Sequence, residues 1–175
     1  MSGASTSDPA DPFPDLGHDH DRCIETALAS AAALCEERGV RLTQLRRQVL
    51  ELIWASHRPI GAYEILNRLV VGRGPTAPPT VYRALEFLSD QRLVHRIDTL
   101  NAFVGCGSPV RAHKAYFLIC SRCGDAAEVA DEGLDAALAE VAQQAGFAVR
   151  NETVELAGIC ARCGRGEADA VGPSH

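Results

Sequence analysis

The pattern of hydrophobic and polar positions predicts four amphipathic helices in residues 21–90. Apolar side chains recur there at intervals of three and four, which is the spacing of one helix face. Gly39 is expected to end the first helix, and Thr43 to cap the second. Proline is tolerated in a first helical turn, so Pro78 and Pro79 begin the fourth helix. The expected ranges are 21–38, 43–56, 62–70 and 78–90, with residues 72–75 as a loop.

After residue 92 the pattern changes to short alternating runs. Residues 93–97 and 102–105 alternate around a turn at 98–101, which predicts a β-hairpin. Helices followed by a hairpin, with basic residues throughout, have the outline of a winged helix-turn-helix. Gly107, Ser108 and Pro109 then indicate a hinge over residues 107–112.

The remaining residues predict a second, smaller unit. Strands are expected at 116–119 and 126–129, a helix at 134–145 with Leu134, Leu138 and Val141 facing inward, and a long strand at 147–159. About fifty residues bury little surface by themselves, so this unit is expected to gain stability from zinc, a partner chain or both. The fold class is therefore α+β, with a winged helix-turn-helix at 21–106 and a small α/β domain at 113–165. The polar tails, 1–20 and 166–175, are predicted to be disordered.

Charge is distributed unevenly along the chain. The net charge is −6, yet residues 41–111 carry ten basic and five acidic side chains. A basic region between acidic flanks can attract a phosphate backbone, although a solvated arginine-rich surface explains it equally well. The chain shows neither an apolar run of membrane-spanning length nor a secretory signal, so we expect a cytoplasmic protein without a membrane partner.

Four of the seven cysteines form two CxxC pairs, Cys120 with Cys123 and Cys160 with Cys163. A two-residue gap allows both sulfurs of a pair to face one ion, and Zn²⁺ prefers four such ligands in a tetrahedron. Four thiolates leave no open coordination position, which predicts a structural rather than a catalytic zinc. Two disulfides or a redox-active dithiol are the alternatives.

Two weaker groups of residues carry further candidate chemistry. His95, Cys106, His113 and Glu128 offer mixed nitrogen, sulfur and oxygen ligands, which suit zinc better than magnesium or calcium. Taken alone, however, such residues are more often ordinary surface or core side chains. Arg83 lies near the start of the fourth helix, where an arginine can read a guanine edge, or can simply be solvated.

Taken together, these motifs resemble the ferric uptake regulator (Fur) superfamily, and within it most closely its zinc uptake regulator (Zur) branch. The resemblance covers residues 24–165. It rests on the following segments: Val40 to Thr43, Ala62 to Leu66, Pro78 to Leu85, Phe117 to Gly124, Gly146 to Val149, and Gly158 to Cys160.

The resemblance implies a homodimeric, zinc-responsive repressor with two zinc ions per chain and a C-terminal dimerisation domain. It implies a structural zinc on the four paired cysteines and a sensor zinc on His95, Cys106, His113 and Glu128. DNA contacts would map to Tyr63 and Arg83, with Tyr82, Thr80 and Arg41 as contacts to the backbone of double-stranded operator DNA. The expected role is to repress zinc-uptake genes when zinc is ample.

Two departures from iron-sensing relatives favour zinc: a single histidine, His113, precedes the first CxxC pair, and Cys106 is a soft ligand. An iron- or peroxide-responsive regulator of the same fold is the alternative. An enzyme is not expected, because the chain has no HExxH or deaminase-type zinc motif. His18 and His20 are interpreted as part of a polar tail, Cys23 as a surface thiol and Cys35 as a core residue.

Overall fold

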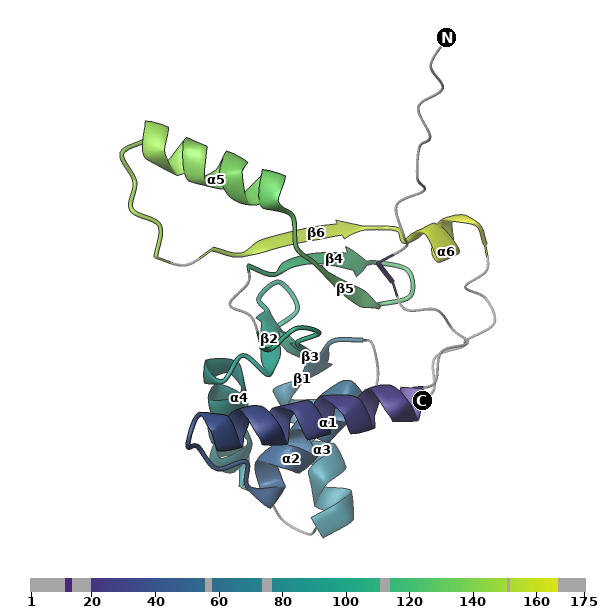
Figure 1. Cartoon of the computed structure of the whole chain (residues 1–175). Helices are drawn as coiled ribbons and strands as arrows, with labels where there is room; N and C mark the ends of the chain where they lie inside the picture. The colour runs from purple at the N-terminus through teal and green to yellow at the C-terminus, as the bar shows by residue number, and fades with distance from the viewer. Residues whose placement is uncertain are drawn as a thin grey trace.

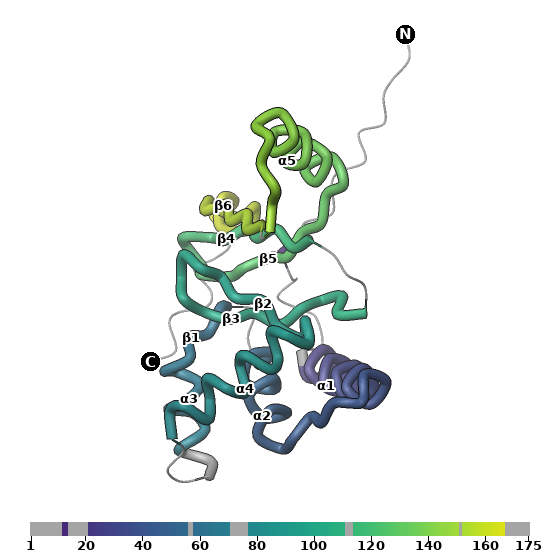
Figure 2. The backbone as a smooth tube through the Cα atoms, turned by 90° about the vertical axis from the view of Figure 1, so that its left-hand side faces the viewer, coloured from purple at the N-terminus to yellow at the C-terminus, as the bar shows by residue number. Residues whose placement is uncertain are grey.

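In the computed structural model of the chain, a group of helices lies below a three-stranded sheet, and a β-hairpin lies between them (Figure 1). The structure describes residues 12–13, 20–55, 58–73, 77–110, 114–150 and 152–166. The helical unit is N-terminal and the upper sheet is C-terminal, as the view turned by 90° also shows (Figure 2). The α+β fold class is thereby confirmed.

Four helices form the N-terminal unit: α1 (His20–Glu37), α2 (Gln44–Trp54), α3 (Ala62–Arg73) and α4 (Pro78–Asp90). Gly39 ends α1 with a φ of +66°, a left-handed conformation that glycine adopts without a Cβ clash. The Thr43 side chain accepts a hydrogen bond from the Arg46 N–H and caps α2, as predicted. The expected loop at 72–75 is wrong in its first half, because α3 continues through Gly72 and Arg73.

The N-terminal core is formed by the apolar faces of these helices. Val49, Ile65 and Leu88 are fully buried where α2, α3 and α4 meet. Cys35 is buried on α1 and belongs to this core, whereas Cys23 is half-buried. The helical periodicity therefore identified the buried faces of these helices. The opposite faces of α3 and α4 are in contact with solvent.

A three-stranded antiparallel sheet completes the N-terminal unit, in the order β1-β3-β2. The predicted hairpin is present as β2 (Val94–Ile97) and β3 (Ala102–Gly105), with His95 opposite Val104. We call this hairpin, with its turn at residues 98–101, the wing. The strand β1 (Ile60–Gly61) was not predicted, because two residues are too short to show alternation.

The C-terminal unit contains β4 (Tyr116–Cys120), β5 (Ala126–Val129), α5 (Glu132–Gln144), β6 (Val154–Gly158) and α6 (Ala161–Gly164). The strand order is β5-β4-β6, with β4 and β6 parallel. The long strand predicted at 147–159 is wrong in its first part, since strand pairing begins only at Val154. Alternation alone could not reveal that residues 147–150 have no neighbouring strand in the described sheet.

The predicted inward face of α5 is not buried in the single chain. Leu134 and Leu138 are half-buried, and the Val141 side chain is 65% exposed. The helical range itself was predicted closely. The apolar face of α5 therefore has no core of its own within the described residues.

The two units contact each other through the wing. Ile97 of β2 is fully buried against Phe117 and Ile119 of β4. Residues 107–110 of the expected hinge have no regular structure, and Arg38 donates a hydrogen bond to the Pro109 carbonyl at 3.2 Å. Residues 111–113 and most of both tails lie outside the described residues, so the domain boundaries and the disorder stay predictions. Among the helices that the structure describes, none is long and apolar enough to cross a membrane.

Candidate metal centres and nucleic-acid interface

The two CxxC pairs converge on one point of the C-terminal unit. Cys120 ends β4 and Cys123 follows in the turn, whereas Cys160 caps the start of α6 and Cys163 lies within it. The four sulfur atoms all lie within 4.8 Å of one another, and those of Cys123 and Cys160 are 3.9 Å apart. A tetrahedral zinc with Zn–S bonds of about 2.3 Å places its sulfurs about 3.8 Å apart. The spacing of the donors therefore fits a four-thiolate zinc.

Backbone geometry prepares this cluster for a cation. Gly124 adopts a φ of +78°, which folds the first knuckle, and its N–H bonds to the Cys120 carbonyl. Burial raises the pKa of Cys120, but hydrogen bonds from the N–H groups of Cys123, Cys160 and Arg122 outweigh burial and lower the pKa to about 6. Burial and the neighbouring cysteines raise the pKa of Cys163 to about 12. Four thiolates in this space require a positive charge beside them, so the donor set fits a metal ion such as zinc.

Charged residues around the cluster link it to the N-terminal unit. Asp125 is ion-paired with Arg162, and its other oxygen lies 3.3 Å from Nε of Arg58, in the loop before β1. Arg162 also lies 3.7 Å from the Cys123 sulfur. The sequence analysis did not predict these roles. Sequence position could have indicated them, because Asp125 directly follows the first CxxC pair and its glycine, and Arg162 lies within the second pair.

An aromatic side chain from the N-terminal tail contacts the same cluster. Phe13 is half-buried and packs against the three buried cysteines, Cys120, Cys160 and Cys163. It belongs to the stretch 1–20 that the sequence predicts to be disordered. Nothing in the periodicity of that stretch pointed to this contact.

The second candidate site lies between the two units. His95 comes from β2, Cys106 from the residue after β3, and Glu128 from β5; their ligand atoms all lie within 4.8 Å of one another. Nε2 of His95 is 3.5 Å from the Glu128 carboxylate, which also accepts the Gly107 N–H at 3.0 Å. Three of the four predicted sensor residues are therefore brought together. The fourth, His113, lies outside the described residues.

Burial shapes the chemistry of this second site. Cys106 is 3% exposed, and burial together with the charge of Glu128 raises the pKa of its thiol to about 12. A thiol of that pKa keeps its proton at neutral pH unless a cation replaces the proton. One imidazole, one thiol and one carboxylate on adjoining elements can hold a transition metal, and the mixture suits zinc.

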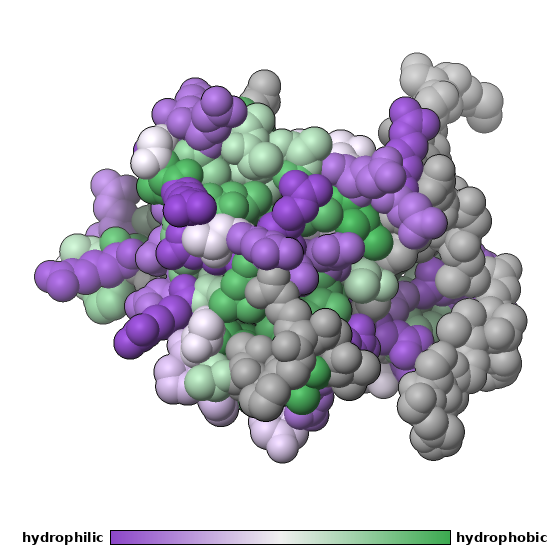
Figure 3. All heavy atoms as spheres, turned by 90° about the horizontal axis from the view of Figure 1, so that it is seen from below, coloured by the Kyte–Doolittle hydropathy of each residue, from purple (hydrophilic) through white to green (hydrophobic). Residues whose placement is uncertain are grey.

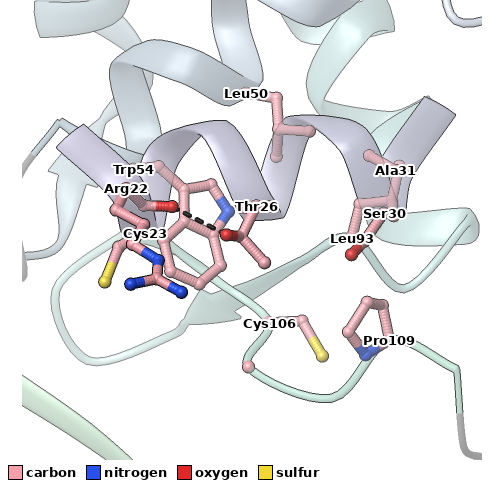
Figure 4. A pocket seen from close by; sticks show the side chains of 12 residues that line it. Arg22, Cys23, Thr26, Ser30, Ala31, Leu50, Trp54, Leu93, Cys106 and Pro109 are labelled. Atoms are coloured by element: carbon pink, nitrogen blue, oxygen red, sulfur yellow. Dashed lines mark hydrogen bonds between the residues drawn. The ribbon is translucent and has the colours of Figure 1, made fainter. Parts of the chain in front are cut away.

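Behind Cys106 the structure contains an apolar cavity of about 430 Å³ (Figure 4). Side chains of α1, among them Thr26 and Ala31, form one wall, and Trp54 from the end of α2 forms another. Cys106 and Pro109 face them from the loop that follows β3. The loop that carries the Cys106 ligand therefore has open space on the side of α1.

The predicted DNA-contacting residues are exposed on the N-terminal unit. Tyr63 at the start of α3 is 75% exposed, and Tyr82 on α4 is 60% exposed. Thr80 and Arg83 of α4 and Arg41 before α2 are exposed as well. Viewed from below, hydrophilic side chains are spread over this end of the molecule between apolar patches (Figure 3).

Not every arginine of the basic region is available for phosphate. The guanidinium of Arg46 lies 3.4 Å from the ring centre of Phe87 and donates to the Arg41 carbonyl at 2.6 Å. Arg68 pairs with Glu64 along α3. The charge count therefore overstates the free basic surface, whereas Arg83 on α4 is exposed.

Comparison with known proteins gives a consistent result. The model of the ferric uptake regulator family matches residues 37–157. The zinc uptake regulation protein of Escherichia coli (strain K12) is 39% identical over 139 residues, which cover 78% of this chain and 80% of the relative. That of Mycobacterium tuberculosis is 32% identical over 127 residues, covering 71% and 95%.

Two solved structures are similar over most of their length. A zinc uptake regulator in complex with zinc and DNA has a TM-score of 0.78 at 38% identity, covering 83% of this chain and 97% of the other. The crystal structure of holo XcZur has a TM-score of 0.73 at 40% identity, covering 80% and 98%.

Proposed function

Because the chain belongs to the ferric uptake regulator family, we propose that it is a zinc-responsive transcriptional repressor. Zinc at the site between the two units promotes binding of a dimer to operator DNA and represses zinc-uptake genes. The observation that carries the proposal is the convergence of His95, Cys106 and Glu128 from both units within 4.8 Å. The likeness to zinc uptake regulators, one of them in complex with zinc and DNA, supports it.

Two zinc ions per chain are proposed, with separate roles. Cys120, Cys123, Cys160 and Cys163 hold the structural ion and supply no open position for catalysis. His95, Cys106 and Glu128, with His113 as the fourth ligand, hold the sensor ion. A bound zinc supplies ligand bonds that link the two units.

The wing and the residue that directly follows it carry two of these ligands, which connects the sensor to DNA binding. His95 and Cys106 lie at the open end of the hairpin, next to α4, whereas Glu128 lies on the C-terminal sheet. A zinc ion that holds these three ligands together fixes the orientation of α4 relative to the C-terminal unit. In a homodimer, that orientation sets the distance between two recognition helices in successive major grooves of the operator. Zinc binding and DNA binding are then coupled reciprocally.

DNA recognition is assigned to the exposed side chains of α3 and α4. Arg83 is proposed to read a base edge, and Tyr63 to make a second specific contact. Tyr82, Thr80 and Arg41 are proposed to contact the phosphate backbone, which orients the helix without reading sequence.

The test is a titration of operator binding with buffered zinc and, separately, with ferrous iron. The protein should start with one zinc per chain, and its affinity for an uptake-gene promoter should rise only with a second zinc. Cys106→Ser should abolish this response while the dimer stays folded, and Cys23→Ser, a thiol outside both sites, should retain it.

The iron- or peroxide-responsive alternative predicts a different outcome. Binding that follows ferrous iron or is lost on peroxide treatment would overturn the zinc sensor while keeping the fold. A Cys106→Ser protein that does not fold would show that the roles of the two sites are exchanged.

A further inference from the structure

The tip of the wing is held by a carboxylate of the opposite unit. Glu155 of β6 accepts the backbone N–H of Asp98 at 2.6 Å and that of Thr99 at 3.1 Å. The same carboxylate accepts the hydroxyl of Thr99. All three donors belong to the N-terminal unit and the acceptor belongs to the C-terminal sheet, so these hydrogen bonds cross between the units.

The turn that Glu155 binds is already fixed by its own contacts. The Asn101 N–H bonds to the Asp98 carbonyl at 3.2 Å, and Asn101 adopts a φ of +47°. Arg96 contacts Asp98 at 3.3 Å and donates to the Asn101 side chain at 3.1 Å. The two N–H groups are therefore presented to Glu155 by a preformed turn, and little conformational freedom is lost when the contact forms.

The surroundings strengthen this contact. Glu155 lies opposite Phe117 in the pairing of β6 with β4, and Phe117 packs against Ile97, directly before the turn. Burial raises the pKa of Glu155, but the Thr99 hydroxyl and the two amides outweigh it and lower the pKa below the usual range. Hydrogen bonds to an ionised carboxylate beside an apolar contact are stronger than those between neutral groups.

The wing is thus held at two ends. The candidate metal site holds its open end through His95 and Cys106, and the His95 ring lies 5.5 Å from that of Phe117. Glu155 holds its closed end. A single point of attachment allows a rigid unit to rotate about that point, whereas two attachments define one orientation.

We propose that Glu155 is a positioning residue that fastens the wing tip to the C-terminal sheet and so fixes the orientation of the N-terminal unit. The contact involves no metal ligand. Its consequences for orientation and for operator affinity rest on the proposed function, in which the sensor metal holds the other end of the wing, but the contact itself does not.

The experiment compares Glu155→Gln and Thr99→Val with Glu25→Gln, which removes an exposed carboxylate on α1. Amide hydrogen exchange at Asp98 and Thr99 is measured by NMR in the full, zinc-loaded chain. Glu155→Gln should accelerate both amides by about tenfold, because it removes the charged acceptor. Thr99→Val should produce a smaller acceleration, and Glu25→Gln none.

Orientation is read by small-angle scattering and its consequence by operator affinity. Glu155→Gln should broaden the distance distribution between the units and weaken operator binding about five- to tenfold, with zinc content unchanged. If circular dichroism shows that Glu155→Gln does not fold, the same exchange, scattering and affinity measurements are made on Thr99→Val.

Unchanged exchange at both amides would overturn the contact. Faster exchange with unchanged scattering would show a local hydrogen bond without a positioning role, which also overturns the proposal. If the unmodified protein ignores zinc in the DNA titration, the proposed function fails, whereas exchange still decides whether Glu155 holds the wing tip.

Discussion

Gly105 shows how one residue controls the geometry of the candidate sensor. It is the last residue of β3 and directly precedes Cys106. A Cβ added at Gly105 would lie 2.5 Å from Nε1 and 2.7 Å from Cζ2 of the Trp54 indole. The ring therefore packs on the bare backbone, and the only residue that permits this approach is glycine. Because Cys106 follows immediately, the packing of Trp54 also places the thiol.

Gly105→Ala is expected to destabilise the protein by about 1–3 kcal/mol, because a buried methyl group would displace the indole or the strand. It should also weaken zinc binding at the sensor site by moving Cys106. Thermal unfolding and a zinc titration measure the two effects. Gly61→Ala is the matched control, since a Cβ there meets nothing within 4 Å. Adding Trp54→Phe to Gly105→Ala should restore part of the lost stability, because the smaller ring leaves room for the methyl group. Unchanged stability in Gly105→Ala would contradict the close packing of Trp54 on Gly105.

At the scale of elements, α4 separates a core face from a recognition face. Val81, Leu85 and Leu88 are buried, whereas Tyr82 and Arg83 are exposed. Arg46 shows that an arginine of the same basic region can instead be used for packing, because it stacks on Phe87 of α4. A role in reading DNA therefore depends on which face of an element carries the arginine.

Arg83→Ala is expected to weaken binding to the cognate operator by about 1–3 kcal/mol and to relax base preference at one position. The physical reason is the loss of a two-hydrogen-bond contact to a base edge. Binding to operator variants, measured at fixed salt, checks this. Arg150→Ala, on the C-terminal unit, should leave affinity unchanged. An equal loss on every sequence would make Arg83 a phosphate contact.

For the whole molecule, the C-terminal unit combines a small core with an exposed apolar surface. Its largest buried cluster apart from the cysteines consists of Ile97, Phe117 and Ile119, and Ile97 belongs to the wing. On α5 and the adjoining segment, Val141 and Phe147 are exposed. Such a unit requires additional stabilisation, and the four-cysteine site is suited to provide it.

Cys160→Ser is expected to remove about one zinc per chain and to unfold the C-terminal unit or abolish the dimer, because metal binding there is part of the folding free energy. Zinc content and light scattering measure the two effects. Cys23→Ser changes a cysteine outside the cluster and should have neither effect. A stable, dimeric Cys160→Ser protein that still binds DNA would contradict the structural role.

Local rules made part of this molecule predictable. The range of α4, the cap at Thr43 and the stop at Gly39 depend on residues within one or two turns, so their signals are present in the sequence. The four-cysteine cluster was also predictable, because each CxxC pair brings its own two sulfurs together. The sensor set was only a weak candidate from residue chemistry, because its members are distant in sequence and individually ordinary, and the family resemblance was needed to make it specific.

The sequence by itself therefore determined the helices, the hairpin and the thiolate pairs, because short-range periodicity and spacing specify them. Only the tertiary structure decided that β1 exists, that β6 is short, and that α5 lacks a core in the single chain. It alone placed Glu155 on the wing tip and Arg58 beside Asp125. These last two contacts join residues more than fifty positions apart. The energies of all these features come from packing and desolvation that no local pattern encodes.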